Sequence, residues 1–332
     1  MALFKNTAEI AVYLPVVSTT DFDSLLPFIN EAERDYIIPK ISQTQYNDLS
    51  VAYNVATPSL TGPQTQLLAR CRAALSQYFF YLWIPTGQLS IGDNGIRIAV
   101  TDTLKTAFPW QIDNLERSVM KSAGRAMDHL LEYMEANKSS YALWTASSSY
   151  TEFKECFITT TKRFTALYGP LGNSHLNFLA IRSAMLKAQD FDIAPEIGEA
   201  FYNELMVQHI AGTVSPQNAF VIERIQKALA PLTMKRAITE MSVTIDERGI
   251  LNFDNTTGGQ TVNSKMPAKD PMILKLETAC EVDGRAYIQK LKDFLKANIS
   301  TYTTYANSSA YDSAATNSDL RSDSADTIFD AF

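Results

Sequence analysis

One short stretch of the sequence gathers side chains that could bind a metal ion or move a proton. Asp128, His129 and Glu132 lie close together, and a helix would bring the two carboxylates toward one face. Such a group can hold a zinc ion or act as general acid and base. The other histidines, His175 and His209, lie in separate predicted elements, so no metal-ligand spacing results. We interpret the group as a solvated helix face and predict no catalytic residue, metal ligand or cofactor.

Other signatures of chemistry are weak. The glycine-rich stretch TGGQT at 257–261 does not lead from a strand into a helix with a lysine, as a phosphate-binding loop would. Nucleophile-elbow, zinc-protease and dinucleotide-binding patterns do not occur. Carboxylates are numerous, but the sequence does not show which of them face each other across a cleft. The residues therefore favour a protein that is not an enzyme.

A line of basic residues recurs at every fourth position in one predicted helix, as Arg117, Lys121 and Arg125. Such a line could follow the phosphates of a nucleic acid. An exposed helix face that pairs with neighbouring acids gives the same pattern. The sequence leaves both interpretations open.

Composition indicates a globular protein. Of its 332 residues 46% are hydrophobic, and the net charge is −7, which argues against a general nucleic-acid coat. We predict neither a signal peptide nor a membrane span. Cys71, Cys156 and Cys280 are odd in number and far apart, which suits folding in a reducing cytoplasm.

The sequence contains an internal duplication. Residues 37–49, IIPKISQTQYNDL, return at 192–205 as DIAPEIGEAFYNEL. Each copy continues with an apolar stripe at helical spacing, introduced by a polar residue and an early proline. Pro231 lies inside the second pattern, where we expect a kink or break. The two stripes are Leu67, Leu68, Cys71, Leu75 and Tyr78, and Val221, Ile222, Ile225, Leu229 and Leu232.

A turn and a second helix complete each copy. Apolar residues flank a glycine-containing turn near 89–100 and near 243–253, which predicts a β-hairpin in each copy. The closing helices share Gly-Arg-Ala, so Arg125 and Arg285 are equivalent. We expect each arginine to form a structural ion pair, or otherwise a contact between subunits.

The predicted fold is mainly α with small β-hairpins, a tandem duplication of a helical-bundle domain. The first domain covers 1–145, a linker helix lies within 146–170, and the second copy covers 171–302 with an extra loop at 254–271. Residues 303–332 are rich in serine and aspartate and predict a flexible acidic arm.

Two groups of apolar residues are candidates for interactions. The run YFFYLW is too continuous for one helix face, so some of its side chains should point away from their own core, unless the linker helix covers them. The arm ends in three apolar residues that could anchor it on a partner, although a plain disordered terminus fits too. The candidates are Tyr78, Phe79, Phe80, Tyr81 and Trp83 in the run, and Ile328, Phe329 and Phe332 in the arm.

The order of elements resembles the head–tail connector proteins of tailed bacteriophages, also called adaptor or head-completion proteins. LLPFINEAERDYIIPKISQTQYNDL at 25–49 is similar to their opening, and QLLARCRAALSQYFFYLW at 66–83 lies where they have their central helix. The chain also resembles uncharacterised double-length proteins of Bacteroidetes phages. Typical adaptors have one such domain, so the duplication is a departure.

This resemblance implies a structural protein of the virion neck, made in the host cytoplasm. It implies a homo-oligomeric ring, of twelve chains or alternatively six, between the portal protein and the tail or a further connector. DNA would pass through the ring without specific contacts, no membrane would be involved, and the arm and the loop 254–271 would lock neighbours. The alternative is a soluble enzyme or ligand-binding protein with a site between the two copies.

Overall fold

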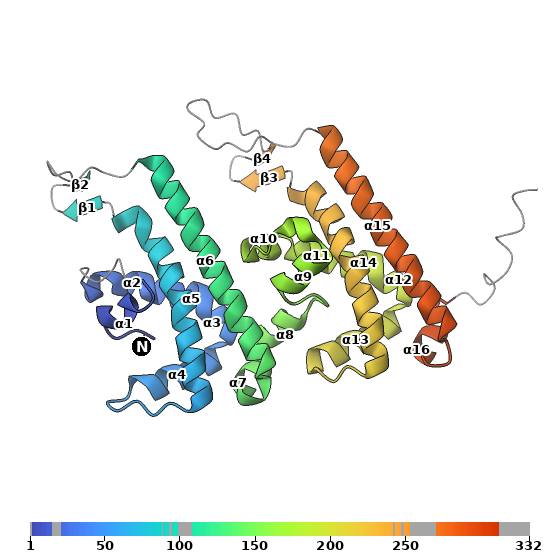
Figure 1. Cartoon of the computed structure of the whole chain (residues 1–332), viewed down its shortest axis with the longest axis horizontal. Coiled ribbons are helices and arrows are strands. Elements are labelled where there is room, and N and C mark those ends of the chain that lie inside the picture. The colour runs from blue at the N-terminus through green and yellow to red at the C-terminus, as the bar shows by residue number, and fades with distance from the viewer. Residues whose placement is uncertain are drawn as a thin grey trace, which may run out of the picture. The chain divides into compact units, whose positions relative to one another are not determined.

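The computed structural model describes residues 2–14, 21–87, 89–92, 95–98, 108–241, 243–246, 249–252 and 270–311. The chain divides into two compact units, Met1–Ala180 and Ile181–Phe332 (Figure 1). Each unit combines short helices, two long helices and one two-stranded antiparallel hairpin. The predicted fold class, a duplicated helical domain with small hairpins, is confirmed.

Unit 1 is built around α5 (Gly62–Gly87), which packs against α6 (Pro109–Ala136) and α2 (Phe22–Ala32). Strands β1 (Leu89–Gly92) and β2 (Gly95–Ile98) pair antiparallel, as the sequence predicted. The shorter helices of this unit are α1 (Thr7–Ala11), α3 (Ile38–Ile41), α4 (Gln43–Asn54), α7 (Ala142–Thr145), α8 (Ser148–Lys154), α9 (Thr161–Leu167) and α10 (His175–Ala180). A π-helical turn (Glu33–Ile37) and two 3-10 turns (Lys138–Ser140, Gly169–Leu171) join them.

Unit 2 repeats this plan around α14 (Pro216–Met241), which packs against α15 (Asp270–Ala297) and α11 (Arg182–Ala188). Strands β3 (Val243–Asp246) and β4 (Gly249–Asn252) form the predicted second hairpin. The remaining elements are a π-helical turn (Gln189–Ile193) and the helices α12 (Ala194–Ile197), α13 (Glu199–Ala211) and α16 (Thr303–Ala306).

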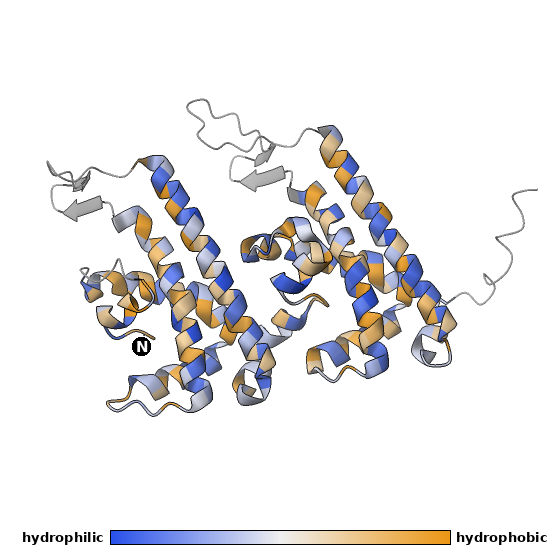
Figure 2. Ribbon diagram, in the orientation of Figure 1, coloured by the Kyte–Doolittle hydropathy of each residue, from blue (hydrophilic) through white to orange (hydrophobic). Residues whose placement is uncertain are grey.

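The central helices begin where the sequence predicted and bury the predicted stripes. Thr61 Oγ1 accepts from Gln64 N, and Gln64 Oε1 accepts from Thr61 N, which caps α5 reciprocally. Ser215 Oγ accepts from Asn218 N at the start of α14. All ten stripe residues are buried. Figure 2 shows hydrophilic and hydrophobic residues alternating along both helix pairs, as amphipathic packing requires.

The structure corrects two predictions about helix continuity. Helix α14 continues through Pro231 to Met241, so the break that was one of the two expected outcomes does not occur. The linker helix predicted within 146–170 is two helices, because α8 ends at Lys154 and Thr160 Oγ1 caps a new helix by accepting from Arg163 N. On α6, Leu115 lies one turn before the buried Val119 but is itself 43% exposed.

The arm does not begin at residue 303. Helix α16 covers Thr303–Ala306, and Tyr305 is fully buried. Thr304 Oγ1 also donates to Glu204 Oε2 at 2.6 Å. Burial of an aromatic ring and a side-chain hydrogen bond offset the entropy of ordering these residues, so residues 303–311 belong to unit 2. The rest of the arm, residues 312–332, lies outside the described residues, as do residues 254–269 of the predicted extra loop.

The two units share an unusual backbone at equivalent positions. Ser42 has φ 73° and ψ 151°, and Gly198, its equivalent, has φ 82° and ψ 132°. This region is nearly restricted to glycine, so Ser42 is strained. In each unit this residue follows a π-helical turn and a short helix with proline in its first turn, and it starts the next helix.

Candidate interaction surface

The aromatic run lies on α5, and most of it faces the core of its own unit. Tyr78, Phe79 and Phe80 are buried, and Tyr81 and Trp83 are partly buried against the same core. Tyr78, Phe79 and Phe80 therefore do not point away from the core, so the expectation that part of the run does so is left to Tyr81 and Trp83. The reason is that α5 has α2 and α6 as neighbours, so its buried surface is wider than one helix face.

Aromatic neighbours from other elements complete this burial. The rings of Tyr36 and Tyr78 are stacked with centroids 4.1 Å apart. The ring of Phe4, from the N-terminal segment, meets Phe79 edge to face at 6.3 Å. Both geometries are favourable for aromatic pairs. The run is therefore mainly a core element of unit 1.

The shared arginines are exposed. Arg285 Nε lies 3.4 Å from Glu281 Oε1, one turn earlier on its own helix, and its side chain is 62% exposed. Arg125 Nη2 donates to Ser122 Oγ at 3.3 Å. An exposed pair within one helix adds little stability. The expected ion pair therefore occurs at Arg285 but not, among the interactions of the described residues, at Arg125.

The glycine before each arginine has a clearer structural role. A Cβ on Gly124 would lie 2.9 Å from His175 Cβ on α10, and one on Gly284 would lie 2.6 Å from Leu232 on α14. Both distances are shorter than normal carbon contacts, so the missing side chain permits close approach. The repeated Gly-Arg-Ala is explained by its glycine.

The predicted basic line is an exposed stripe on α6. Arg117, Lys121 and Arg125 are all exposed, and His129 extends the stripe by one turn. Among the ion pairs of the described residues, none involves these three basic side chains. The stripe is available to an acidic partner or to phosphate, and pairing with neighbouring acids does not account for it.

The group Asp128, His129 and Glu132 does not form one site. His129 is exposed, whereas Asp128 Oδ1 accepts from Thr161 Oγ1 at 2.9 Å and lies 2.7 Å from His175 Nδ1. His175 is buried, and its Nε2 has no hydrogen-bond partner in the described part of the chain. Asp128 thus ties α9 and α10 to α6, which is a structural task.

A surface groove in unit 2 was not predicted. It has a volume of about 550 Å³ and is open to solvent. Helix α14 contributes a face with residues at the i, i+3, i+4 and i+7 positions, and α15 contributes one at i, i+3 and i+7. These spacings were the signal in the sequence, but they concern two helices far apart in the chain. The lining residues are Phe220, Glu223, Arg224, Lys227, Tyr287, Lys290 and Phe294.

Aromatic rings and cations alternate in this groove. Arg224 Cζ lies 3.8 Å from the centre of the Phe294 ring, and Arg224 Nη1 donates to the carbonyl of Phe220 at 3.0 Å. Lys290 Nζ lies 5.4 Å from the Tyr287 ring. These are cation–π distances. Phe220 is 58% exposed, so a large apolar side chain stands beside the cations in contact with water.

Unit 1 has only part of this arrangement. Arg70 Cζ lies 3.7 Å from the Tyr133 ring, which reproduces the Arg224–Phe294 pair. Gln66, Ala69 and Ala73 stand where α14 has Phe220, Glu223 and Lys227. The groove is therefore a specialisation of the second copy.

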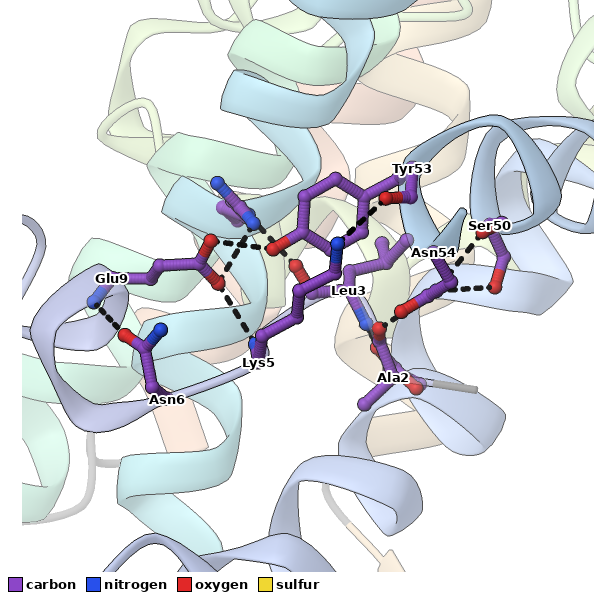
Figure 3. Close-up of polar contacts among 10 residues, drawn as sticks. Ala2, Leu3, Lys5, Asn6, Glu9, Ser50, Tyr53 and Asn54 are labelled. Atoms are coloured by element: carbon purple, nitrogen blue, oxygen red, sulfur yellow. Dashed lines mark hydrogen bonds and ion pairs between the residues drawn. The ribbon is translucent and has the colours of Figure 1, made fainter. Parts of the chain in front are cut away.

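The N-terminal segment of unit 1 is held by a polar network (Figure 3). Lys5 N donates to Glu9 Oε2 at 2.8 Å, and Lys5 Nζ donates to the carbonyl of Tyr53 at 2.8 Å. Tyr53 Oη donates to Glu9 Oε1. Arg72 Nη2 lies 2.9 Å from Glu9 Oε2, and Arg72 Nε donates to the carbonyl of Leu3 at 2.8 Å. No local sequence pattern indicates this network, because its members are far apart in the chain.

The network changes the acid strength of its members. Burial acts to raise the pKa of Glu9, but the hydrogen bonds from Tyr53 and Lys5 and the charge of Arg72 hold that pKa below its ordinary value. Burial and the hydrogen bond to Glu9 raise the pKa of Tyr53 to about 12. Glu9 is therefore a carboxylate at neutral pH that fastens residues 3–9 to α4 and α5.

Nearby, Glu33 is a buried carboxyl that satisfies two donors. Leu3 N donates to Oε1 at 2.6 Å and Tyr46 Oη donates to Oε2 at 2.7 Å. Burial raises the pKa of Glu33, although both hydrogen bonds act to lower it.

No group of histidine, cysteine, aspartate or glutamate side chains within the described ranges could hold a metal ion. The described helices are also too short or too polar to cross a membrane. What these residues offer for function is thus an exposed basic stripe, a groove of rings and cations, and exposed apolar side chains.

Comparison with protein families locates the duplication independently. One family model, described as a family of unknown function (DUF6712), matches residues 37–154 and again residues 193–315. The chain belongs to the DUF6712 family. Each match covers the central helix, the hairpin and the closing helix of one copy, so the family unit is a single copy and this chain contains two. Neither a curated protein nor a solved structure matches the chain.

Proposed function

We propose that this DUF6712 protein is a structural virion protein of a tailed bacteriophage. Its copies would form a ring, of twelve chains or alternatively six, between the portal protein and the tail or a further connector. The observation that carries the proposal is the duplication: two units share one buried frame and differ on their surfaces. A chain built in this way can offer different contacts to different partners while keeping one geometry.

Exposed apolar side chains at the start of both closing helices support contacts between subunits. Phe108, the N-cap of α6, and Trp110 in its first turn are 63% and 55% exposed. The first turns of α15 carry Met272 and Leu274, which are 65% and 63% exposed. Large apolar residues in contact with water are typical of surfaces that become buried on assembly. In a closed ring each such surface would meet a neighbouring chain.

Charge is consistent with the passage of DNA. The net charge of −7 would repel phosphate over most of the surface, so a channel of such chains would not grip the DNA. The exposed stripe of Arg117, Lys121 and Arg125 is a local exception. It would suit an acidic surface of a neighbouring subunit or of the portal.

Labelling of purified virions tests the proposal. Residues Ala56–Ser59 form an exposed loop between α4 and α5, so a short epitope inserted there leaves the described contacts intact. We expect gold-conjugated antibody against the epitope to mark the neck between head and tail. Label spread over the head, label at the distal tail, or absence of the protein from virions would contradict the proposal.

A further inference from the structure

The groove of unit 2 is a positively charged, aromatic surface on an acidic protein. Arg224, Lys227 and Lys290 supply three cations, and Glu223 is the one acid that lines it. Glu223 already lies 2.8 Å from Lys227 Nζ. Rings and cations set side by side suit a ligand that itself combines rings with carboxylates.

The chain contains such a ligand in its own sequence. Residues 326–332 read DTIFDAF, in which Asp326 and Asp330 alternate with Ile328, Phe329 and Phe332. Aromatic rings of this segment could stack on those of the groove, and its carboxylates could pair with the groove's cations. The segment therefore has the negative charges and aromatic rings that complement the cations and rings of the groove.

The end of the described fold lies close enough to the groove for residues 326–332 of the same chain to reach it. Tyr302 Oη donates to the carbonyl of Gln217 at 3.1 Å, so the segment leading to α16 lies beside the start of α14. Phe220 is one turn further along α14. Fourteen residues, 312–325, separate the described fold from Asp326 and could span about 45 Å. A tether of this length gives an effective concentration near millimolar, which favours binding within the chain.

We propose that in the free protein the groove lined by Phe220, Arg224, Lys227, Tyr287, Lys290 and Phe294 binds residues 326–332 of the same chain. Unit 1 lacks this site, because alanine or glutamine replaces three of the α14 residues. The docking keeps the aromatic side chains of the groove, among them the exposed Phe220, out of contact with other molecules. This docking occurs within a single chain, so it does not depend on the proposed oligomeric ring.

Site-specific photocrosslinking on the full-length chain tests this directly. Phe329 is replaced by p-benzoylphenylalanine, and unlabelled and 15N-labelled chains are mixed at low concentration before irradiation. We expect cross-links within one chain, to peptides containing Phe220–Lys227 or Tyr287–Phe294. Cross-links to other regions, or mainly between labelled and unlabelled chains, would overturn the proposal.

Charge reversal separates docking from chance proximity. The double variant Lys227→Glu/Lys290→Glu should lower the yield of these cross-links about fivefold, because two attractive pairs become repulsive. Lys275→Glu, an exposed lysine on α15 outside the groove, is the matched control and should leave the yield unchanged. Equal yields in the double variant and the control would refute the proposed site.

Discussion

The two units solve the same packing problem with the same contacts in their interior. Tyr141 Oη donates to the carbonyl of Pro63 at 3.0 Å, and its equivalent Tyr302 donates to the carbonyl of Gln217 at 3.1 Å. In each case a buried ring after the closing helix fastens the start of the central helix. Contacts repeated in detail show that both copies kept one frame, so differences between them report on their separate tasks.

The two units differ in the buried aromatic residue three positions later, which is Trp144 in unit 1 and Tyr305 in unit 2. Trp144 Nε1 donates to the carbonyl of Lys40 at 2.9 Å. Its equivalent Tyr305 is equally buried, but its hydroxyl has no hydrogen-bond partner among the described residues. An unpaired buried hydroxyl costs free energy, so unit 2 is under-satisfied at a position where unit 1 is complete.

A second difference concerns the buried polar pair of each unit. In unit 1 the carboxylate of Glu33 accepts from Tyr46 and from Leu3 of the N-terminal segment. In unit 2 Gln189 Nε2 donates to Tyr202 Oη at 3.3 Å. A carboxylate can only accept, so it suits a position where a backbone N–H must also be satisfied. Unit 1 thus uses the oxygens of a buried carboxyl group to hold a segment that precedes its first long helix.

The largest expected effect comes from removing that carboxylate. Glu33→Ala removes the buried acceptor to which both Leu3 N–H and Tyr46 O–H donate, which should lower the free energy of unfolding of unit 1 by about 3 kcal/mol. Urea titration followed by hydrogen exchange on peptides of each unit measures this. Glu33→Gln, which copies unit 2, should lose less than about 1 kcal/mol. Equal losses in both variants would show that the two hydrogen bonds do not matter.

At the equivalent positions Ser42 and Gly198, putting the residue of one unit into the other should change stability in opposite directions. Gly198→Ser puts a side chain at φ 82°, where its Cβ would also lie 2.5 Å from Ser308 Cβ, and should destabilise unit 2 by about 2 kcal/mol. Ser42→Gly relieves strain but loses a cap to Gln45 N, so unit 1 should gain up to about 1 kcal/mol. Thermal unfolding of each variant gives the sign. Destabilisation by both substitutions would contradict the account.

Replacing the equivalent residues Trp144 and Tyr305 by phenylalanine should change the free energy of unfolding by smaller amounts, and differently in the two units. Trp144→Phe loses the hydrogen bond to Lys40 and part of the ring, at a cost of about 1.5 kcal/mol. Tyr305→Phe removes only a hydroxyl without a described partner, so the stability of unit 2 should stay within about 0.5 kcal/mol of the parent or rise. Unit-resolved hydrogen exchange checks both. A marked loss in Tyr305→Phe would reveal a partner for its hydroxyl.

The smallest effect is a dependence on pH. Because burial raises the pKa of Glu33 above the ordinary 4.5, its stabilising contribution is complete below that pH and declines as the pH rises through the folded-state pKa. Glu33→Gln lacks this decline. The difference in unfolding free energy, variant minus parent, should therefore become more positive as the pH rises from about 4 toward neutrality. A difference that stays constant over this range would mean that the carboxyl is not perturbed.

The sequence predicted most of the frame. The stripes from Leu67 to Tyr78 and from Val221 to Leu232 are buried because helical periodicity is a local property, and its recurrence in two copies strengthened the assignment. Hairpins followed in the same way from the turn residues. The break expected at Pro231 is absent because α11 and α15 pack against α14, and this packing outweighs the local cost of proline.

Tertiary features could not be predicted in this way. The burial of Phe79 depends on Phe4, which lies far away in the sequence. The groove depends on α14 and α15 being neighbours, so the sequence pattern of either helix alone does not predict it. Ile328, Phe329 and Phe332 lie outside the described residues, and their role as anchors stays a prediction. Local patterns specify elements, whereas sites arise where elements meet.

Mass photometry of the purified full-length chain, alone and mixed with portal-bearing phage heads, measures whether the chain assembles into the proposed ring. If the duplicated frame builds a connector, we expect a discrete assembly of twelve or six chains, in solution or on the head. A chain that stays monomeric alone and does not associate with the heads at any concentration tested would contradict the account.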